Sequence, residues 1–492
     1  MDAKGYNVDR KDVDAAFHTL ELSSTDELGD ATQVDDRRLL RKLDWTLMPL
    51  MFMSYFLQYS DKTLINYAAV MGLIEDTEMP ENGFSHLAIA FYCTFFVFEP
   101  IQAFCLQKFP VAKWLGANVI CFGILMCLNC VCRSYAPLLT LRILLGVFES
   151  VTAPALNLLT TMFYKRHEQV VRTGYWYQGT SIGPAVSSLV AYGFVHWADS
   201  APNASFKPWQ VLYLLYGLVT IVTGILVILF LPDNPMKSRF THEEKLVIVE
   251  RIRENNTGIE NKRFKWPQFK ETVADPRTWL LSAIVMSTNV PNGAVSSFSS
   301  IIIQNFGYDT YQTLLLNLPA AAISFASVWL ATWWAGRYNG RGIAIIALVV
   351  PTLVGGALMA WLSPNNKAGL LAGYYLTGTV GSSLPLMYSW IGANYAGHTK
   401  KITMNAIVLM SFCVGNVIGP ETFQAKDAPQ YIPAKITIVA VLSAAVVLVI
   451  ALDLLFIREN KTRERAGHVD MPTNFEFMDL TDKENRTFRY LL

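Results

Sequence analysis

The sequence predicts an all-α integral membrane protein with about twelve transmembrane helices in two pseudo-symmetric six-helix halves. Three observations lead to this fold class. Of the 492 residues, 52% are hydrophobic and only 16% are charged, whereas about a quarter of the residues in soluble domains are charged. The apolar residues form repeated runs of about 20, the length that a helix needs to cross a bilayer. A long polar segment divides these runs into two sets.

Each apolar run predicts one membrane-crossing helix. The first set lies at about 45–70, 85–107, 113–132, 136–163, 174–197 and 209–231. The second set lies at about 278–303, 311–335, 342–362, 368–392, 404–424 and 434–457. We therefore expect a tail at 1–44, a first half at 45–231, a central loop at 232–277, a second half at 278–457 and a tail at 458–492.

The central loop is polar and mixed in charge, but its pattern predicts a helix. Thr241 and Glu244 have the spacing of a capping box, in which each side chain bonds the other residue's backbone N–H. Leu246, Val249 and Ile252 follow at helical spacing. We expect this helix to lie against the membrane face.

The lysines and arginines of the short loops predict the orientation. Loops on one side hold Lys165, Arg166 and Arg172, and also Lys400 and Lys401, whereas the 75–81 loop holds four acids and no base. Positive charge favours the cytosolic side of a membrane. Since an even number of spans returns the chain to the same side, we expect both termini in the cytosol.

Composition and motifs exclude several classes of protein. A net charge of +1 argues against a nucleic-acid partner held by bulk electrostatics. The seven cysteines lie in or beside apolar runs without zinc-type spacing, so we expect no metal site. No HExxH motif, nucleophile elbow or P-loop is present, so an enzyme is not expected.

Charged residues within an apolar run are costly and usually face a cavity or a partner. Asp61 and Lys62 lie well inside the first run. Adjacent residues diverge by about 100° around a helix, so both cannot face one pathway. We expect one to line a cavity and the other to pair with a neighbouring helix.

Two further acids and an arginine lie in the second and fourth runs. Arg142 and Glu149 are seven residues apart and share one helix face. They are either a pathway face with a cation and a titratable carboxylate, or a structural ion pair between helices. Glu99, before Pro100, is either a proton carrier or an interhelical hydrogen-bonding group.

Polar and aromatic residues near helix breaks are further candidates. Asn289 and Asn292 flank Pro291, and Gln178 is a further amide at membrane depth, in the fifth run. Side-chain amides and backbone groups that lose their helical hydrogen bonds at such breaks can line a cavity. An isolated amide, however, more often forms a hydrogen bond between two helices. Among many aromatic residues, Tyr388 in the tenth run could stack on an organic substrate.

The ordered motifs resemble one family over residues 40–460. They include YSDKTLINYA with Asp61-Lys62, LQKFPVAKWLG at 106–116, LRILLGVFESVTAPAL at 141–156, NVPNG at 289–293 and GNVIGPETFQAKDAPQYIPA at 415–434. In these segments the chain resembles the fungal allantoate permease group of the major facilitator superfamily, which are anion:cation symporters. Distant relatives of that group have a base where Lys62 stands and share the Arg142-x6-Glu149 pattern.

The resemblance implies import of a small organic anion, such as a vitamin, ureide or other carboxylate, by proton-coupled alternating access. It needs no cofactor beyond the proton gradient, and implies a monomer in the lipid bilayer of the plasma membrane. The resemblance implies that Lys62 and Arg142 meet the carboxylate and that Glu149 titrates. With the candidates from the sequence pattern, the expected substrate-binding residues are Lys62, Arg142, Asn289, Asn292, Gln178 and Tyr388, and the expected proton-coupling residues are Glu149, Glu99 and Asp61.

One motif departs from the superfamily pattern. The loop between helices two and three usually has an acid followed by arginine, but LQKFPVAKWLG has bases and no acid. The gating ion pair of other members is therefore not expected from this loop. The alternative functions are a uniporter or exporter, which needs no titrating carboxylate in its pathway, and a nutrient sensor on the same fold.

Overall fold

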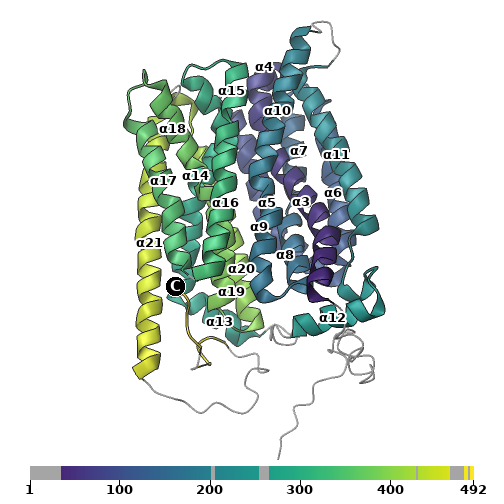
Figure 1. Cartoon of the computed structure of the whole chain (residues 1–492). Helices are drawn as coiled ribbons and strands as arrows, with labels where there is room; N and C mark the ends of the chain where they lie inside the picture. The colour runs from purple at the N-terminus through teal and green to yellow at the C-terminus, as the bar shows by residue number, and fades with distance from the viewer. Residues whose placement is uncertain are drawn as a thin grey trace, which may run out of the picture.

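The computed structural model describes residues 35–200, 206–253, 265–338, 340–427, 430–465, 481–485 and 488–492. Every regular element within them is a helix, and no strand occurs there. The predicted all-α fold is therefore confirmed. The helices stand side by side in two groups (Figure 1). We call the end of the bundle at which α3 begins the base and the opposite end, with α4 and α15, the top.

The first group covers the first set of apolar runs. Its helices are α3 (Asp36–Ala68), η1 (Ala69–Leu73), α4 (Ile74–Asp76), α5 (Gly83–Lys108), α6 (Val111–Asn129), α7 (Tyr135–Glu149), α8 (Thr152–Phe163), α9 (Arg166–Tyr177), α10 (Gly179–Ser200) and α11 (Pro208–Phe230). Helix α3 begins nine residues before its predicted run. Leu39, Leu43 and Leu47 explain this, because they recur every four residues and are buried.

The second group covers the second set. Its helices are α14 (Pro276–Asn305), α15 (Thr310–Leu316), α16 (Leu318–Tyr338), α17 (Arg341–Trp361), α18 (Lys367–Thr377), η3 (Val380–Ser382), α19 (Ser383–Asn394), α20 (His398–Glu421), η4 (Ala425–Asp427) and α21 (Ile432–Arg465). Helices α14 and α20 cross very closely. A Cβ on Gly293 would lie 2.7 Å from the Cα of Asn416, so this crossing requires glycine.

Eight helical stretches in the described residues are long and apolar enough to cross a membrane. They lie on α5, α6, α7–α8, α11, α15–α16, α17, α20 and α21. The remaining predicted spans, on α3, α9–α10, α14 and α18–α19, are also helical. They are less apolar or interrupted: α3 contains Asp61 and Lys62, and η3 separates α18 from α19. Polar groups therefore concentrate in a subset of the helices.

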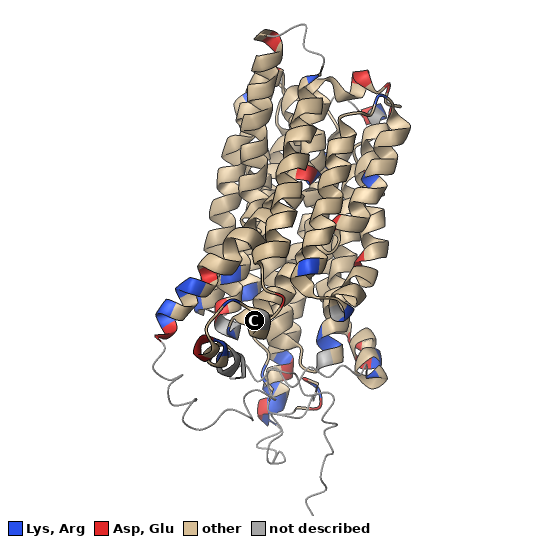
Figure 2. Ribbon diagram, turned by 90° about the vertical axis from the view of Figure 1, so that its right-hand side faces the viewer, with Lys and Arg blue, Asp and Glu red and all other residues tan. Residues whose placement is uncertain are grey.

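Charged side chains gather at the base and are sparse along the bundle (Figure 2). The central segment contributes η2 (Pro235–Lys237), α12 (His242–Arg253) and α13 (Trp266–Ala274). The capping box is formed at α12, where the Thr241 N–H donates to Glu244 Oε2 at 3.0 Å and the Glu244 N–H to Thr241 Oγ1 at 3.3 Å. Lys42 Nζ lies 2.7 Å from Glu244 and fixes α12 to α3.

Residues 481–485 and 488–492, which we call the docked segment, pack against the base of the second group. Asp482 lies 2.7 Å from Lys400 Nζ and 3.3 Å from Arg277 Nη2. The Leu491 N–H donates to Asn394 Oδ1 at 2.7 Å, and Asn394 Nδ2 donates to Leu491 O at 2.7 Å. The docked segment thereby ties together the base ends of α14, α19 and α20.

Candidate functional site

The charged residues of the first group meet around α3. Arg142 on α7 donates through Nη1 to Asp61 Oδ2 at 3.0 Å and through Nη2 to the Tyr213 hydroxyl on α11 at 2.8 Å. Asp61 is fully buried and Arg142 nearly so. Because an unpaired charge at this depth is costly, the pair fixes α7 against α3. Asp61 is thus the member of the Asp61-Lys62 step that pairs with a neighbouring helix.

Glu149 lies at a break between two helices. Helix α7 ends at Glu149 and α8 begins at Thr152, so the Glu149 carbonyl loses its place in the helix ladder. Gln58 Nε2 on α3 donates to this carbonyl at 3.0 Å. Since Gln58 and Asp61 are one turn apart, they share one face of α3, and this face looks toward Glu149.

Three carboxylate oxygens at this place lack partners. Glu149 is fully buried, and neither of its oxygens has a hydrogen-bond partner among the described residues; the same holds for Asp61 Oδ1. Asp61, Arg142 and Lys62 lie within electrostatic reach of Glu149. A carboxylate becomes a donor only when it is protonated. A proton on Glu149 would therefore give Asp61 Oδ1 the donor that it lacks.

Lys62 points into a cage of aromatic rings. Its Nζ lies 5.0 Å from the ring centre of Tyr59, 5.2 Å from that of Tyr92 and 5.9 Å from that of Phe412. Tyr59 and Tyr92 belong to the first group of helices and Phe412 to the second. Ring faces attract a cation but do not neutralise it. In the described part of the chain Lys62 has no hydrogen bond or ion pair, so its charge is available to an anion.

Glu99 and Tyr388 lie across the boundary between the two groups. Glu99 on α5 is 5% exposed, and its Oε1 has no partner among the described residues. It lies within electrostatic reach of Tyr388 on α19 and Cys413 on α20. Cys413 lies within reach of Lys62 as well. Both residues therefore belong to the same central region as the aromatic cage.

The two asparagines predicted on either side of Pro291 form an amide chain between α14 and α20. Asn292 Nδ2 donates to Asn289 Oδ1 at 3.4 Å and to Asn416 Oδ1 at 3.1 Å. Asn416 in turn donates to Phe412 O at 2.8 Å. The chain lies one helical turn from the Phe412 ring of the cage, and most of its polar atoms are already engaged between helices.

Gln178 lies at the junction between α9 and α10. Its Nε2 donates to Phe325 O on α16 at 3.2 Å, and its Oε1 has no partner among the described residues. The nearby Tyr177 hydroxyl donates to Gly381 O at 3.0 Å. Both bonds join the two groups of helices, so Gln178 lies at the boundary between them.

Toward the top, one buried amide joins the two groups. Asn66 on α3 is fully buried. Its Nδ2 donates to Ser299 Oγ at 2.5 Å and its Oδ1 accepts from the Ser300 N–H at 3.0 Å. The ring of Phe298, also on α14, stacks on Phe423 at 4.8 Å. The two hydrogen bonds hold the top of α3 against α14, and the ring pair holds α14 against the segment that follows α20.

The acid that is missing from the 106–116 loop comes from elsewhere in the chain. Asp233 Oδ1 accepts from the Ala112 and Lys113 N–H groups at 3.1 and 3.2 Å, and its Oδ2 lies 3.9 Å from Lys113 Nζ. Asp233 therefore accepts hydrogen bonds from the free N–H groups in the first turn of α6 and forms a weak ion pair with Lys113. Sequence reasoning missed it because it follows α11, 120 residues later.

Sequence reasoning also missed Tyr213 and the aromatic cage. Tyr59 precedes Lys62 by three residues, and this spacing on one helix face could have identified it. Tyr213, Tyr92 and Phe412 are distant in sequence and carried no signal. Among the described residues, no group of His, Cys, Asp and Glu side chains could hold a metal ion.

Comparisons with known proteins agree with this architecture. A family model described as Major Facilitator Superfamily matches residues 51–420. Among curated proteins, a thiamine pathway transporter of Saccharomyces cerevisiae is 34% identical, with 99% of this chain and 94% of the relative covered. The allantoate permease of the same organism is also 34% identical, with 98% and 90% covered.

Solved structures resemble the fold at much lower identity. The proton:xylose symporter XylE matches with a TM-score of 0.67 and 12% sequence identity, over 82% of this chain and 94% of that one. At this identity the likeness concerns the fold alone. It extends over both groups of helices.

Proposed function

Because the chain belongs to the Major Facilitator Superfamily and is a membrane transporter like its fungal relatives, we propose that it imports a small organic anion together with a proton. The family predicted from the sequence is confirmed, and with it the prediction that the protein is not an enzyme. The observation that supports proton-coupled anion transport is the buried group of Asp61, Arg142 and Glu149 beside the unpaired cation Lys62.

The charges of these four residues link the proton to the anion. With Glu149 ionised, two cations and two carboxylates sum to zero. A proton on Glu149 alone leaves a net charge of +1, and an anion alone leaves −1. Net charge in a buried site is costly, whereas proton and monoanion together restore neutrality. The group is therefore stable when it is empty or doubly loaded, which is the condition for symport.

We assign the substrate carboxylate to Lys62. Its ammonium has no hydrogen-bond acceptor among the described residues, and the rings of Tyr59, Tyr92 and Phe412 offer faces on which a planar organic anion can stack. Because Phe412 comes from the other half, a substrate in the cage would touch both halves, as alternating access requires. Arg142 remains a second cation for the carboxylate if it releases Asp61.

The other candidates take supporting places in this proposal. Tyr388 and Glu99 lie within electrostatic reach of each other and of Cys413, and we assign Glu99 as a second proton carrier. Asn289 and Asn292 contact the substrate only if their amide chain rearranges. Gln178 lies at the boundary between the two halves, where its hydrogen bond to Phe325 O would change as the halves move.

The relatives support this substrate class. The name of the allantoate permease identifies a carboxylate as the substrate of that protein. Another relative, the high affinity cysteine transporter of Saccharomyces cerevisiae, is 27% identical over 98% of this chain, and cysteine also has a carboxylate. We propose a small carboxylate as the substrate, in the range of ureides, vitamins and amino acids.

We further propose that the base faces the cytosol. Lysines and arginines gather there (Figure 2), and positive charge favours the cytosolic side. Both termini would then be cytosolic, in a monomer in the plasma membrane. Contacts such as Asn66 with Ser299 would then close the outer end of the boundary between the halves.

Uptake into cells that lack their own carriers tests the proposal. Radiolabelled carboxylate vitamins, ureides and amino acids are offered at acidic and neutral external pH, with and without an uncoupler. Uptake of one compound that rises at acidic pH and collapses with the uncoupler supports proton-coupled import. Uptake that ignores both conditions indicates a uniporter, and no uptake by protein at the cell surface indicates an exporter or a sensor.

A further inference from the structure

Two adjoining hollows lie between α3 and α11 on the outside of the first half. The upper one, which we call the trough, has a volume of about 390 Å³, and the lower one, which we call the mouth, about 600 Å³. Leu50 and Leu226 line both. The two hollows therefore form one continuous groove that runs from the base into the depth of the membrane.

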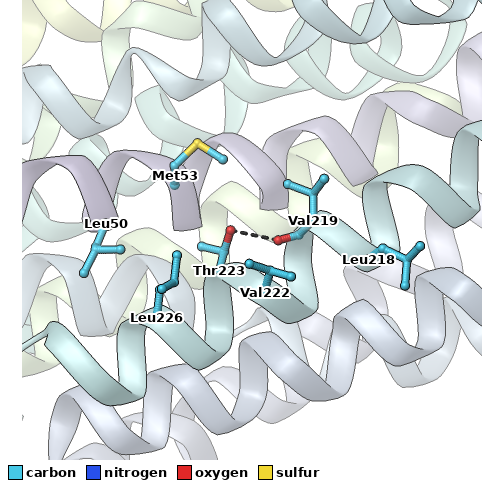
Figure 3. A pocket seen from close by; sticks show the side chains of 7 residues that line it. All are labelled: Leu50, Met53, Leu218, Val219, Val222, Thr223 and Leu226. Carbon is cyan, nitrogen blue, oxygen red and sulfur yellow. Dashed lines mark hydrogen bonds between the residues drawn. The ribbon is translucent and has the colours of Figure 1, made fainter.

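The trough is lined by hydrocarbon. Its walls are Leu50 and Met53 on α3 and Leu218, Val222 and Leu226 on α11 (Figure 3). Its one hydroxyl, on Thr223, is already bonded to Val219 O of the same helix at 2.9 Å. A trough of this kind offers nothing to water or to a polar ligand, but it fits an acyl chain.

The mouth adds positive charge to the same groove. Lys42, Lys113 and Arg239 line it, against the single acid Asp233. Lys42 is neutralised by Glu244 at 2.7 Å. The side chain of Lys113 is 63% exposed and its ammonium lies 3.9 Å from Asp233, beyond hydrogen-bonding distance. This leaves most of its donors available.

Arg239 is held in place without an ion pair to any of the described residues. Its Nη2 donates to Leu229 O at 3.1 Å, and its guanidinium lies over the Phe230 ring at 5.2 Å. Neither contact supplies a negative charge. Trp45, also in the mouth, is 81% exposed, and exposed tryptophan is characteristic of the headgroup level of a membrane.

The groove has the length of one leaflet. From Leu218 to Phe230 on α11 is twelve residues, or about 18 Å at 1.5 Å per residue, and half of the hydrocarbon core is about 15 Å. The cations lie at the surface end of this length and the hydrocarbon walls lie deeper. This order of charge and apolar surface matches a phospholipid that stands in the leaflet at the base.

We propose that the groove binds one anionic phospholipid, with its phosphate and headgroup acid at Lys113 and Arg239 and one acyl chain in the trough. A zwitterionic phospholipid fits the trough equally well but gains less from two cations, so headgroup charge sets the selectivity. The lipid would lie between α3, which carries Asp61 and Lys62, and α11, which carries Tyr213. The site does not depend on what the protein transports.

Native mass spectrometry of the detergent-solubilised full chain tests this site. The protein is titrated with phosphatidylserine or phosphatidylcholine of identical acyl chains. We expect one phosphatidylserine to be retained in preference to phosphatidylcholine. The double variant Lys113→Gln/Arg239→Gln should bind phosphatidylserine roughly 30-fold more weakly, since each base near a membrane surface contributes about a factor of five.

Three further variants separate the groove from general lipid contact. Lys108→Gln removes a positive charge from the same loop as Lys113 but outside the groove. This variant should still retain phosphatidylserine. Val222→Trp fills the trough and should lose the retained lipid, whereas Ile225→Trp on the same helix, 45% exposed outside the trough, should keep it. Equal retention of the two lipids, or a double variant that binds like the wild type, overturns the proposal.

Discussion

Replacing Glu149 with glutamine separates the proton from the substrate. The amide is close in shape to a protonated carboxyl group and can donate permanently to Asp61 Oδ1, but it cannot ionise. It removes a buried carboxylate that has no hydrogen-bond partner among the described residues and adds a hydrogen bond to a charged group, worth about 1.5 kcal/mol or more. We therefore expect Glu149→Gln to fold and to melt at a higher temperature than the wild type.

The effect on transport follows from the charge count. In the wild type, one proton per monoanion couples uptake to the pH difference, and each pH unit is worth about 1.4 kcal/mol, or tenfold in accumulation. Across two pH units the wild type should accumulate substrate about 100-fold. In Glu149→Gln, the remaining charges of Asp61, Arg142 and Lys62 sum to +1. The anion then crosses without a proton, and a pH difference should produce no accumulation.

Proteoliposomes with purified protein distinguish these outcomes. A pH difference and a potassium diffusion potential are imposed separately, and uptake of the labelled substrate is followed. Glu149→Gln should respond to the potential and ignore the pH difference. Glu421→Gln, which changes an exposed acid at the end of α20, should behave like the wild type. Accumulation by Glu149→Gln that is driven by the pH difference would refute the role of Glu149.

Three further predictions follow from other contacts. Lys62→Gln leaves the aromatic cage without a cation and should reduce kcat/KM for uptake by more than about 100-fold, corresponding to the loss of one charge-assisted bond of about 3 kcal/mol. Asn66→Ala removes both bonds to α14, so outside thiol reagents should label a cysteine placed at Ser296 about fivefold faster or more. Burial tends to raise the pKa of Asp275, but the hydrogen bonds and charge of Arg277 outweigh it and lower the pKa to about 2. Because this pKa lies below the ordinary 3.8, Asp275 should stabilise the fold fully above about pH 4 and lose that contribution as the pH falls toward 2, measured by thermal melting between pH 5 and 2.

Each of these predictions has a control. Lys62→Arg keeps the charge and should retain part of the uptake. Asn129→Ala removes a buried amide that bonds within its own helix, and should leave labelling unchanged. Asp275→Asn should melt with a weaker dependence on acid than the wild type. Labelling that is equally fast in both asparagine variants would contradict a closing role for Asn66.

Much of the fold could be predicted because a membrane span leaves a strong local signal. Runs of about 20 apolar residues located the helices, and the Thr241–Glu244 spacing located α12. The ends of the long helices were less predictable. Helix α3 begins at Asp36 because leucines every fourth residue bury one face among charged neighbours, a pattern that average hydropathy conceals. Helix α21 continues to Arg465 beyond its apolar run.

The candidate site was predictable only where residues lie close in sequence. The adjacent positions of Asp61 and Lys62 predicted that one would pair with a neighbouring helix, and Asp61 pairs with Arg142. The spacing of Arg142 and Glu149 left a structural ion pair between helices open, and Arg142 forms such a pair with Asp61 on α3. The Tyr213 hydroxyl and the Phe412 ring reach the site from α11 and α20, and no sequence pattern connects them to α3.

The docked segment could not be anticipated for a similar reason. The sequence indicated a polar tail at 458–492, and nothing in the order of its residues identifies a docking surface. Asp482 finds its place because Lys400 and Arg277 lie at the base ends of two different helices. The contact depends on how α14 and α20 pack, which follows from Gly293 and its neighbours.

The central claim, symport of a proton with a monoanion, is tested most directly by the pH inside vesicles. Proteoliposomes that enclose a pH-sensitive dye receive the substrate from outside, without any imposed gradient, beside protein-free vesicles and Lys62→Gln vesicles. The account predicts that the interior acidifies as substrate enters, at one proton per monoanion, and only with the wild-type protein. Entry of labelled substrate with no change in internal pH would contradict it.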